Sequence, residues 1–105
     1  MKYVPREMAV TLDRALGVMP VVVLTGLRQV GKSTMLRNDA ALRCRSYISL
    51  DDYAAMRAMQ ENPLALLDTS EDLTVDEAQR ISEIFHAVKR VVDKERRPGR
   101  FLLSG

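Results

Sequence analysis

The stretch TGLRQVGKST, residues 25–34, constrains the fold of this chain more than any other feature. Gly26 is followed by four residues and then by Gly31, Lys32 and Ser33, which is the pattern G-x-x-x-x-G-K-[ST]. In loops of this pattern, backbone N–H groups surround phosphate oxygens, the lysine reaches the β and γ phosphates, and the hydroxyl binds Mg²⁺. The pattern therefore predicts a loop that binds ATP and Mg²⁺. The residues expected to line it are Gly26, Leu27, Arg28, Gln29, Val30, Gly31, Lys32, Ser33 and Thr34.

The segments around this loop predict alternating strands and helices. Residues 21–25 read VVVLT, a β-branched run without alternation, which is typical of a strand buried on both faces of a parallel sheet. The helix after the loop would direct the positive end of its dipole at the phosphates. The expected helices are one that starts near Pro5 and ends by residues 17–20, then 32–43, 52–60 and 64–68, and a last one whose face spans 81–95. The expected strands cover 21–25, 46–50, 73–76 and 100–105. The predicted class is α/β, a three-layer fold with a parallel sheet and a preceding N-terminal helix.

Capping residues set several of these boundaries. Asp51 is the expected cap of the third helix, and Asn62 followed by Pro63 is the expected start of the fourth. Ser82 is the expected cap of the last helix, whose apolar residues, Phe85 among them, fall on one face.

A second acidic motif follows the third strand. Residues 73–79 read LTVDEAQ, so that an apolar strand delivers Asp76 and then Glu77. Asp76 at the strand end is expected to hold Mg²⁺ through water, and Glu77 to polarise the water that attacks the γ-phosphate. Downstream of a phosphate-binding loop, this order is the Walker B layout.

Taken together, these motifs give the chain a family resemblance. The stretches YVPR, GLRQVGKST, SLDD, VDEAQR and RPGRFLLSG resemble the AAA-type predicted ATPases of bacteria and archaea, in which a C-terminal domain follows the P-loop domain. The resemblance implies one domain over residues 1–105, an AAA core of strands 1 to 4 that is incomplete at its C-terminus. Leu27 stands where the family usually has proline.

The same resemblance implies roles and partners. Ser104 matches the polar sensor at the end of the strand between the two motif strands. The family's strand order, 5-1-4-3-2, would leave the first strand at an edge. A homo-oligomer or a missing C-terminal domain is the implied partner. The arginine and second sensor that complete hydrolysis are expected beyond the fourth strand, so the isolated chain is expected to turn over ATP slowly or not at all.

Two other functions stay open from the sequence. A small P-loop kinase could use Asp51 and Asp52 near its acceptor and the basic residues Arg96, Arg97 and Arg100 as a lid, although Glu77 favours hydrolysis. A nucleotide-binding fragment without turnover is the third interpretation.

Composition constrains the partners and the compartment of the chain less than the motifs constrain its function. The net charge of +2 does not imply a polyanionic partner, and the basic last quarter leaves nucleic acid open without a supporting motif. A single cysteine, Cys44, favours a reducing cytoplasm, and His86 is expected on the surface. The longest apolar run is too short to span a bilayer, so no membrane segment is expected.

Overall fold

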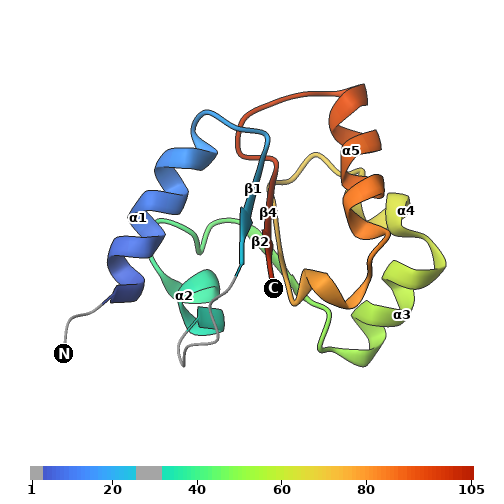
Figure 1. Cartoon of the computed structure of the whole chain (residues 1–105), viewed down its shortest axis with the longest axis horizontal. Helices are drawn as coiled ribbons and strands as arrows, with labels where there is room; N and C mark the ends of the chain where they lie inside the picture. Colours follow the sequence, from blue (N-terminus) through green and yellow to red (C-terminus); the bar gives the residue numbers. More distant parts are fainter. Residues whose placement is uncertain (1–3, 26–31) are drawn as a thin grey trace.

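The computed structural model describes residues 4–25 and 32–105, which form alternating helices and strands (Figure 1). The helices are α1 (Val4–Leu16), α2 (Lys32–Asn38), α3 (Tyr53–Glu61), α4 (Pro63–Leu67), the 3-10 turn η1 (Ala78–Arg80) and α5 (Ile84–Lys94). The strands are β1 (Val21–Leu24), β2 (Ser46–Ser49), β3 (Leu73–Asp76) and β4 (Phe101–Ser104). No helix within the described ranges is long and apolar enough to cross a membrane.

The four strands form one parallel sheet in the order β1-β4-β3-β2. β4 is last in the chain but lies between β1 and β3, where Leu24 pairs with Ser104 and Val75 with Leu103. Because all strands are parallel, their carboxyl ends share one edge of the sheet. This order confirms the predicted α/β fold and the predicted place of the last strand.

Helices cover both faces of the sheet, which makes three layers (Figure 1). Phe101 and Leu103 pack in a core with α3, α4 and α5, whereas Leu102, between them on β4, packs in a second core with α1 and α2. Successive side chains of a strand point to opposite faces, so one buried strand contributes to both cores. Each fully buried side chain of this size stabilises the fold by roughly 1.5–3 kcal/mol.

Two helices are shorter than their apolar patterns predict. α2 ends at Asn38 instead of residue 43, because the Asp39 carboxylate accepts the Ala41 N–H at 3.0 Å and starts a separate turn. α5 begins at Ile84, one residue later than a cap at Ser82 predicts, because the capping position is Glu83. The predicted cap Ser82 donates instead to the Glu83 carboxylate at 3.3 Å.

The capping aspartate of α3 is Asp52 and not Asp51. The Asp52 carboxylate accepts the Ala55 N–H at 2.9 Å, while Asp51 pairs with Arg80 at 2.7 Å. The prediction was wrong by one residue because adjacent aspartates offer the same capping chemistry. Asn62 caps α4 as predicted, with its side chain accepting the Ala65 N–H at 3.2 Å.

Two predictions of burial were wrong. β1 is an edge strand and is not buried on both faces, since Val23 is 46% exposed. Phe85 on α5 is also 46% exposed, although its spacing placed it on the core face. Arg100, one of the three basic residues considered for an exposed kinase lid, is buried, with its guanidinium donating to the carbonyl oxygens of Glu95 and Thr69.

Candidate functional site

The predicted site residues gather at the carboxyl edge of the sheet. Asp76 ends β3, Ser104 ends β4, and Lys32 with Ser33 begins α2, which follows β1 in the chain. The predicted loop residues Gly26, Leu27, Arg28, Gln29, Val30 and Gly31 lie outside the described residues, whereas Thr34 lies on α2 and is exposed.

The carboxylate of Asp76 is the centre of the site. Its Oδ2 atom accepts hydrogen bonds from the Ser33 hydroxyl at 2.6 Å and from the Tyr47 hydroxyl at 2.8 Å. Its Oδ1 atom accepts the Glu77 backbone N–H at 2.9 Å and lies 3.4 Å from the Lys32 ammonium. The two sequence motifs, 43 residues apart, are therefore in direct contact.

These contacts keep Asp76 ionised although it is buried. Burial alone would raise the pKa of this carboxyl, but the hydrogen bonds from Ser33 and Tyr47 and the charge of Lys32 outweigh burial and lower the pKa. Burial and the hydrogen bond to Asp76 raise the pKa of Tyr47 to about 12, so Tyr47 stays a donor at neutral pH. Asp76 is thus a preformed anionic oxygen site.

Glu77 lies beside this centre in an uncommon backbone conformation. Its φ and ψ of 56° and 39° are left-handed, which few non-glycine residues adopt. The Oε2 atom lies 3.9 Å from the Lys32 ammonium, and Oε1 accepts a hydrogen bond from the Gln79 amide at 2.8 Å. Lys32 therefore bridges both acidic residues of the motif.

Ser104 is fully buried, and its hydroxyl has no hydrogen-bond partner among the described residues. Buried polar groups without a partner are rare, because each costs about 1–3 kcal/mol. The carboxyl end of β4 therefore carries a buried hydroxyl without a partner among the described residues. The arrangement agrees with the predicted position of Ser104 between the motif strands.

The donor set fits Mg²⁺ with a bound phosphate. Mg²⁺ takes one or two protein oxygens and completes its shell with water and phosphate, so it needs no cage of acidic residues. Within residues 4–25 and 32–105, no group of three or more His, Cys, Asp or Glu side chains could hold a metal by itself. The Ser33 hydroxyl and the Asp76 carboxylate, 2.6 Å apart, provide adjacent oxygens of the kind that Mg²⁺ prefers.

The sequence did not reveal Tyr47 or Gln79 as members of this cluster. Tyr47 reaches Asp76 because β2 pairs with β3, with Tyr47 beside Thr74 in the register. Gln79 belongs to the VDEAQR stretch, but neither motif assigns it a contact or a role.

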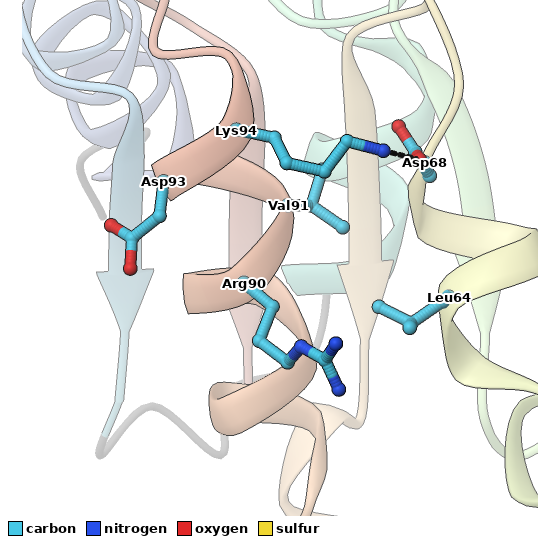
Figure 2. A pocket seen from close by; sticks show the side chains of 6 residues that line it. All are labelled: Leu64, Asp68, Arg90, Val91, Asp93 and Lys94. Atoms are coloured by element: carbon cyan, nitrogen blue, oxygen red, sulfur yellow. Dashed lines mark hydrogen bonds and ion pairs between the residues drawn. The ribbon is translucent and has the colours of Figure 1, made fainter.

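Two cavities are lined by described residues, one beside the Asp76 cluster and one away from it. One of about 230 Å³ adjoins the site and is lined by Val23, Thr25, Ala78, Gln79, Phe85, Leu103, Ser104 and Gly105. The other, of about 380 Å³, lies between α4 and α5 and is lined by Leu64, Asp68, Arg90, Val91, Asp93 and Lys94 (Figure 2). None of the second group belongs to the Asp76 cluster.

Comparison with known proteins places this site in a family. The sequence profile of the AAA domain matches residues 19–105, which include both motifs and all four strands. The chain belongs to the AAA domain family. This AAA domain is 37% identical over 100 residues to uncharacterized proteins of Mycobacterium bovis and Mycobacterium tuberculosis. The match covers 95% of the chain and 23% of each relative. No solved structure matches the chain significantly.

Proposed function

We propose that this AAA domain binds ATP with Mg²⁺ at the loop of residues 25–34 and hydrolyses it. The observation that carries the proposal is the 2.6 Å hydrogen bond between Ser33 and Asp76, with Lys32 3.4 Å from the same carboxylate. A serine and an aspartate in this contact are the pair that holds Mg²⁺ in P-loop NTPases.

Each residue has a separate role in the proposed reaction. Lys32 moves from Asp76 and Glu77 to the phosphate oxygens, and Ser33 and Asp76 hold the metal, Asp76 through water. Glu77, freed from Lys32, accepts a proton from the attacking water. Ser104 donates its hydroxyl to the γ-phosphate or to that water. Mg²⁺ held by Ser33 and Asp76 would supply charge neutralisation on the phosphates.

The basic residues support hydrolysis over transfer to an acceptor. Arg97 is paired with Asp72 at 2.6 Å, and Arg100 is buried against Glu95 and Thr69. Two of the three arginines that a kinase lid would need are thus engaged in the fold. Asp51, proposed near a kinase acceptor, is paired with Arg80.

Calorimetric titration with Mg·ATP tests the binding. The Lys32→Ala variant is expected to lose detectable affinity, because the lysine contacts the phosphates directly. Lys89→Ala is the matched control, since Lys89 lies on α5 and pairs with Asp93 on the surface. Equal affinity of the wild type and Lys32→Ala would overturn the proposal.

Phosphate release by the purified chain tests hydrolysis and separates it from binding without turnover. The rate is expected to be low, because an arginine that stabilises the transferred phosphoryl group contributes about 10³–10⁵ in rate and is expected from another segment or subunit. Binding with no release above the Glu77→Gln background would establish the non-hydrolysing interpretation.

The partner of the protein and its cellular compartment are also proposals. We infer a homo-oligomer or a further domain as partner, since the chain spans 23% of the relatives' length. Cys44 is exposed and is the single cysteine of the sequence, which suits a reducing cytoplasm.

A further inference from the structure

Gln79 contacts the proposed catalytic glutamate directly. Its side-chain amide donates to Glu77 Oε1 at 2.8 Å, while the other oxygen, Oε2, lies 3.9 Å from the Lys32 ammonium. Both oxygens of the Glu77 carboxylate therefore have a partner. The amide is neutral and orients the carboxylate without cancelling its charge.

The backbone at Glu77 makes this contact feasible. Side chains two residues apart on a helix point away from each other. The left-handed conformation of Glu77, followed by η1, turns the chain so that the Gln79 side chain returns to the Glu77 carboxylate. Such conformations cost of order 1–3 kcal/mol and persist where the surroundings hold them, as the Asp76 carboxylate does here by accepting the Glu77 N–H.

Gly105, directly after β4, leaves room for the Gln79 amide because it has no side chain. A Cβ atom built on Gly105 would overlap the Gln79 amide oxygen and lie 3.0 Å from its Cδ atom. Gly105 is fixed in turn, because its N–H donates to the Leu24 carbonyl oxygen at 3.1 Å. A side chain at residue 105 would therefore displace the amide, at little expense to the fold, because the amide is the far end of a flexible side chain.

We propose that Gln79 is a positioning residue that orients Glu77 for hydrolysis, and that Gly105 leaves the space that this contact requires. The proposal rests on the proposed function. Lys32 cannot hold Glu77 and the phosphates at the same time, so the Gln79 hydrogen bond is the one that remains when nucleotide is bound. Without it the Glu77 carboxylate would rotate among several orientations.

Two variants disturb the contact by independent routes. Gln79→Leu removes the donor with little change of volume, and Gly105→Ala leaves Gln79 in place but displaces its amide. Both are expected to lower kcat about tenfold, the rate equivalent of one hydrogen bond, while the KM for ATP and the calorimetric affinity change less than about twofold. Gln60→Leu is the matched control, because Gln60 is an exposed glutamine on α3.

A spectroscopic measurement detects the contact without turnover. In a ¹⁵N-labelled chain, the side-chain amide signal of Gln79 is expected to shift in Glu77→Ala and in Gly105→Ala, and to stay in Gln60→Leu. Unchanged or raised kcat in both test variants would overturn the positioning role, as would a KM that rises in step with the fall in kcat. A Gln79 amide signal that does not shift in Glu77→Ala would overturn the contact itself. Wild-type chain that binds no nucleotide would contradict the proposed function instead, and the amide signal would still decide whether Gln79 holds Glu77.

Discussion

The Asp76 carboxylate shows how single residues set the chemistry of this site. Ser33 and Tyr47 donate to one of its oxygens, and the Glu77 N–H and the Lys32 ammonium are beside the other. Hydrogen bonds to the charged form stabilise it, so the carboxylate stays ionised in a buried place. Its neighbour Glu77 is held by fewer groups and stays free to exchange partners. In the proposed reaction, Asp76 is thus fixed to bind the metal and Glu77 is placed to accept a proton.

Substitutions of the two acidic residues are expected to separate binding from turnover. Glu77→Gln keeps the shape of the side chain but cannot accept a proton, so nucleotide affinity should change little while phosphate release falls by about 10²-fold or more. Asp76→Asn should instead weaken the Mg²⁺-dependent part of the affinity. Calorimetry with and without Mg²⁺, together with phosphate release, measures both. A Glu77→Gln variant that lost affinity and kept its rate per bound nucleotide would reverse the assigned roles.

Tyr47→Phe is expected to destabilise the fold by about 1–2 kcal/mol, because it removes one hydrogen bond to a buried charged carboxylate. The Ser33 contact would remain, so the chain should still fold. Urea denaturation at neutral pH measures the change in free energy of unfolding. Tyr53→Phe is the matched control, since the Tyr53 hydroxyl only accepts from Arg57 on the surface. Equal effects of the two variants would show that the Asp76 contact adds no stability.

The residues with intrinsic chemistry were predictable from the sequence, and the residues that position them were not. Lys32, Ser33 and Asp76 belong to motifs whose spacing predicts a shared site, and the structure brings them together. The contacts of Tyr47 and Gln79 depend on geometry, namely the register of β2 against β3 and the left-handed turn at Glu77. Neither the register nor the turn leaves a pattern in the order of residues.

At the scale of elements, strands were easier to predict than helix ends. β3 has the predicted limits because a short apolar run ends at the acidic pair. α2 and α5 depart from prediction because local side-chain contacts at Asp39 and at residues 77–83 compete with the helical pattern. The edge position of β1 agrees with the strand order that the family resemblance implies, whereas its β-branched residues alone wrongly predicted burial on both faces.

Arg100 directly precedes β4 and connects it to α5 and to the segment after α4. It donates to the end of α5 at Glu95 and to the segment after α4 at Thr69, and it lies 3.5 Å from the Asp68 carboxylate. Lys94 on α5 donates to the same carboxylate at 3.0 Å (Figure 2). The hydrogen bond from Lys94, its charge and Arg100 lower the pKa of Asp68 below its ordinary value of 3.8.

Asp68→Asn is expected to lower Tm slightly at neutral pH and to have no such effect in acid. Because the pKa of Asp68 is lower in the folded chain than in the unfolded chain, its ionised form stabilises the fold above the unfolded value, and this stability is lost as pH falls through the folded value. The effect is small because the pair is exposed. Thermal unfolding of both chains at neutral pH and at a series of pH values descending from 3.8 measures it. A difference in Tm that did not change with pH would exclude the charge as its cause.

In the whole molecule, the proposed site lies at the carboxyl edge of the sheet, beside the start of α2. The sheet brings the ends of β3 and β4 to one edge, and α2 begins there with Lys32 and Ser33. The helices on the two faces bury separate cores, so the site lies on a scaffold that is packed on both sides. In the described part of the chain, β1 pairs with β4 only and presents its other side unpaired.

This unpaired edge is expected to make the chain self-associate. An edge strand offers free N–H and C=O groups to another strand, and Val23 on β1 is 46% exposed. Val23→Lys should weaken the association several-fold, because two edges that pair symmetrically would bring like charges together. Val18→Lys is the matched control, since Val18 is 72% exposed but precedes the strand. Sedimentation equilibrium over a range of concentrations measures the association constant, and an equal loss in both variants would assign the effect to general surface charge and not to the edge of β1.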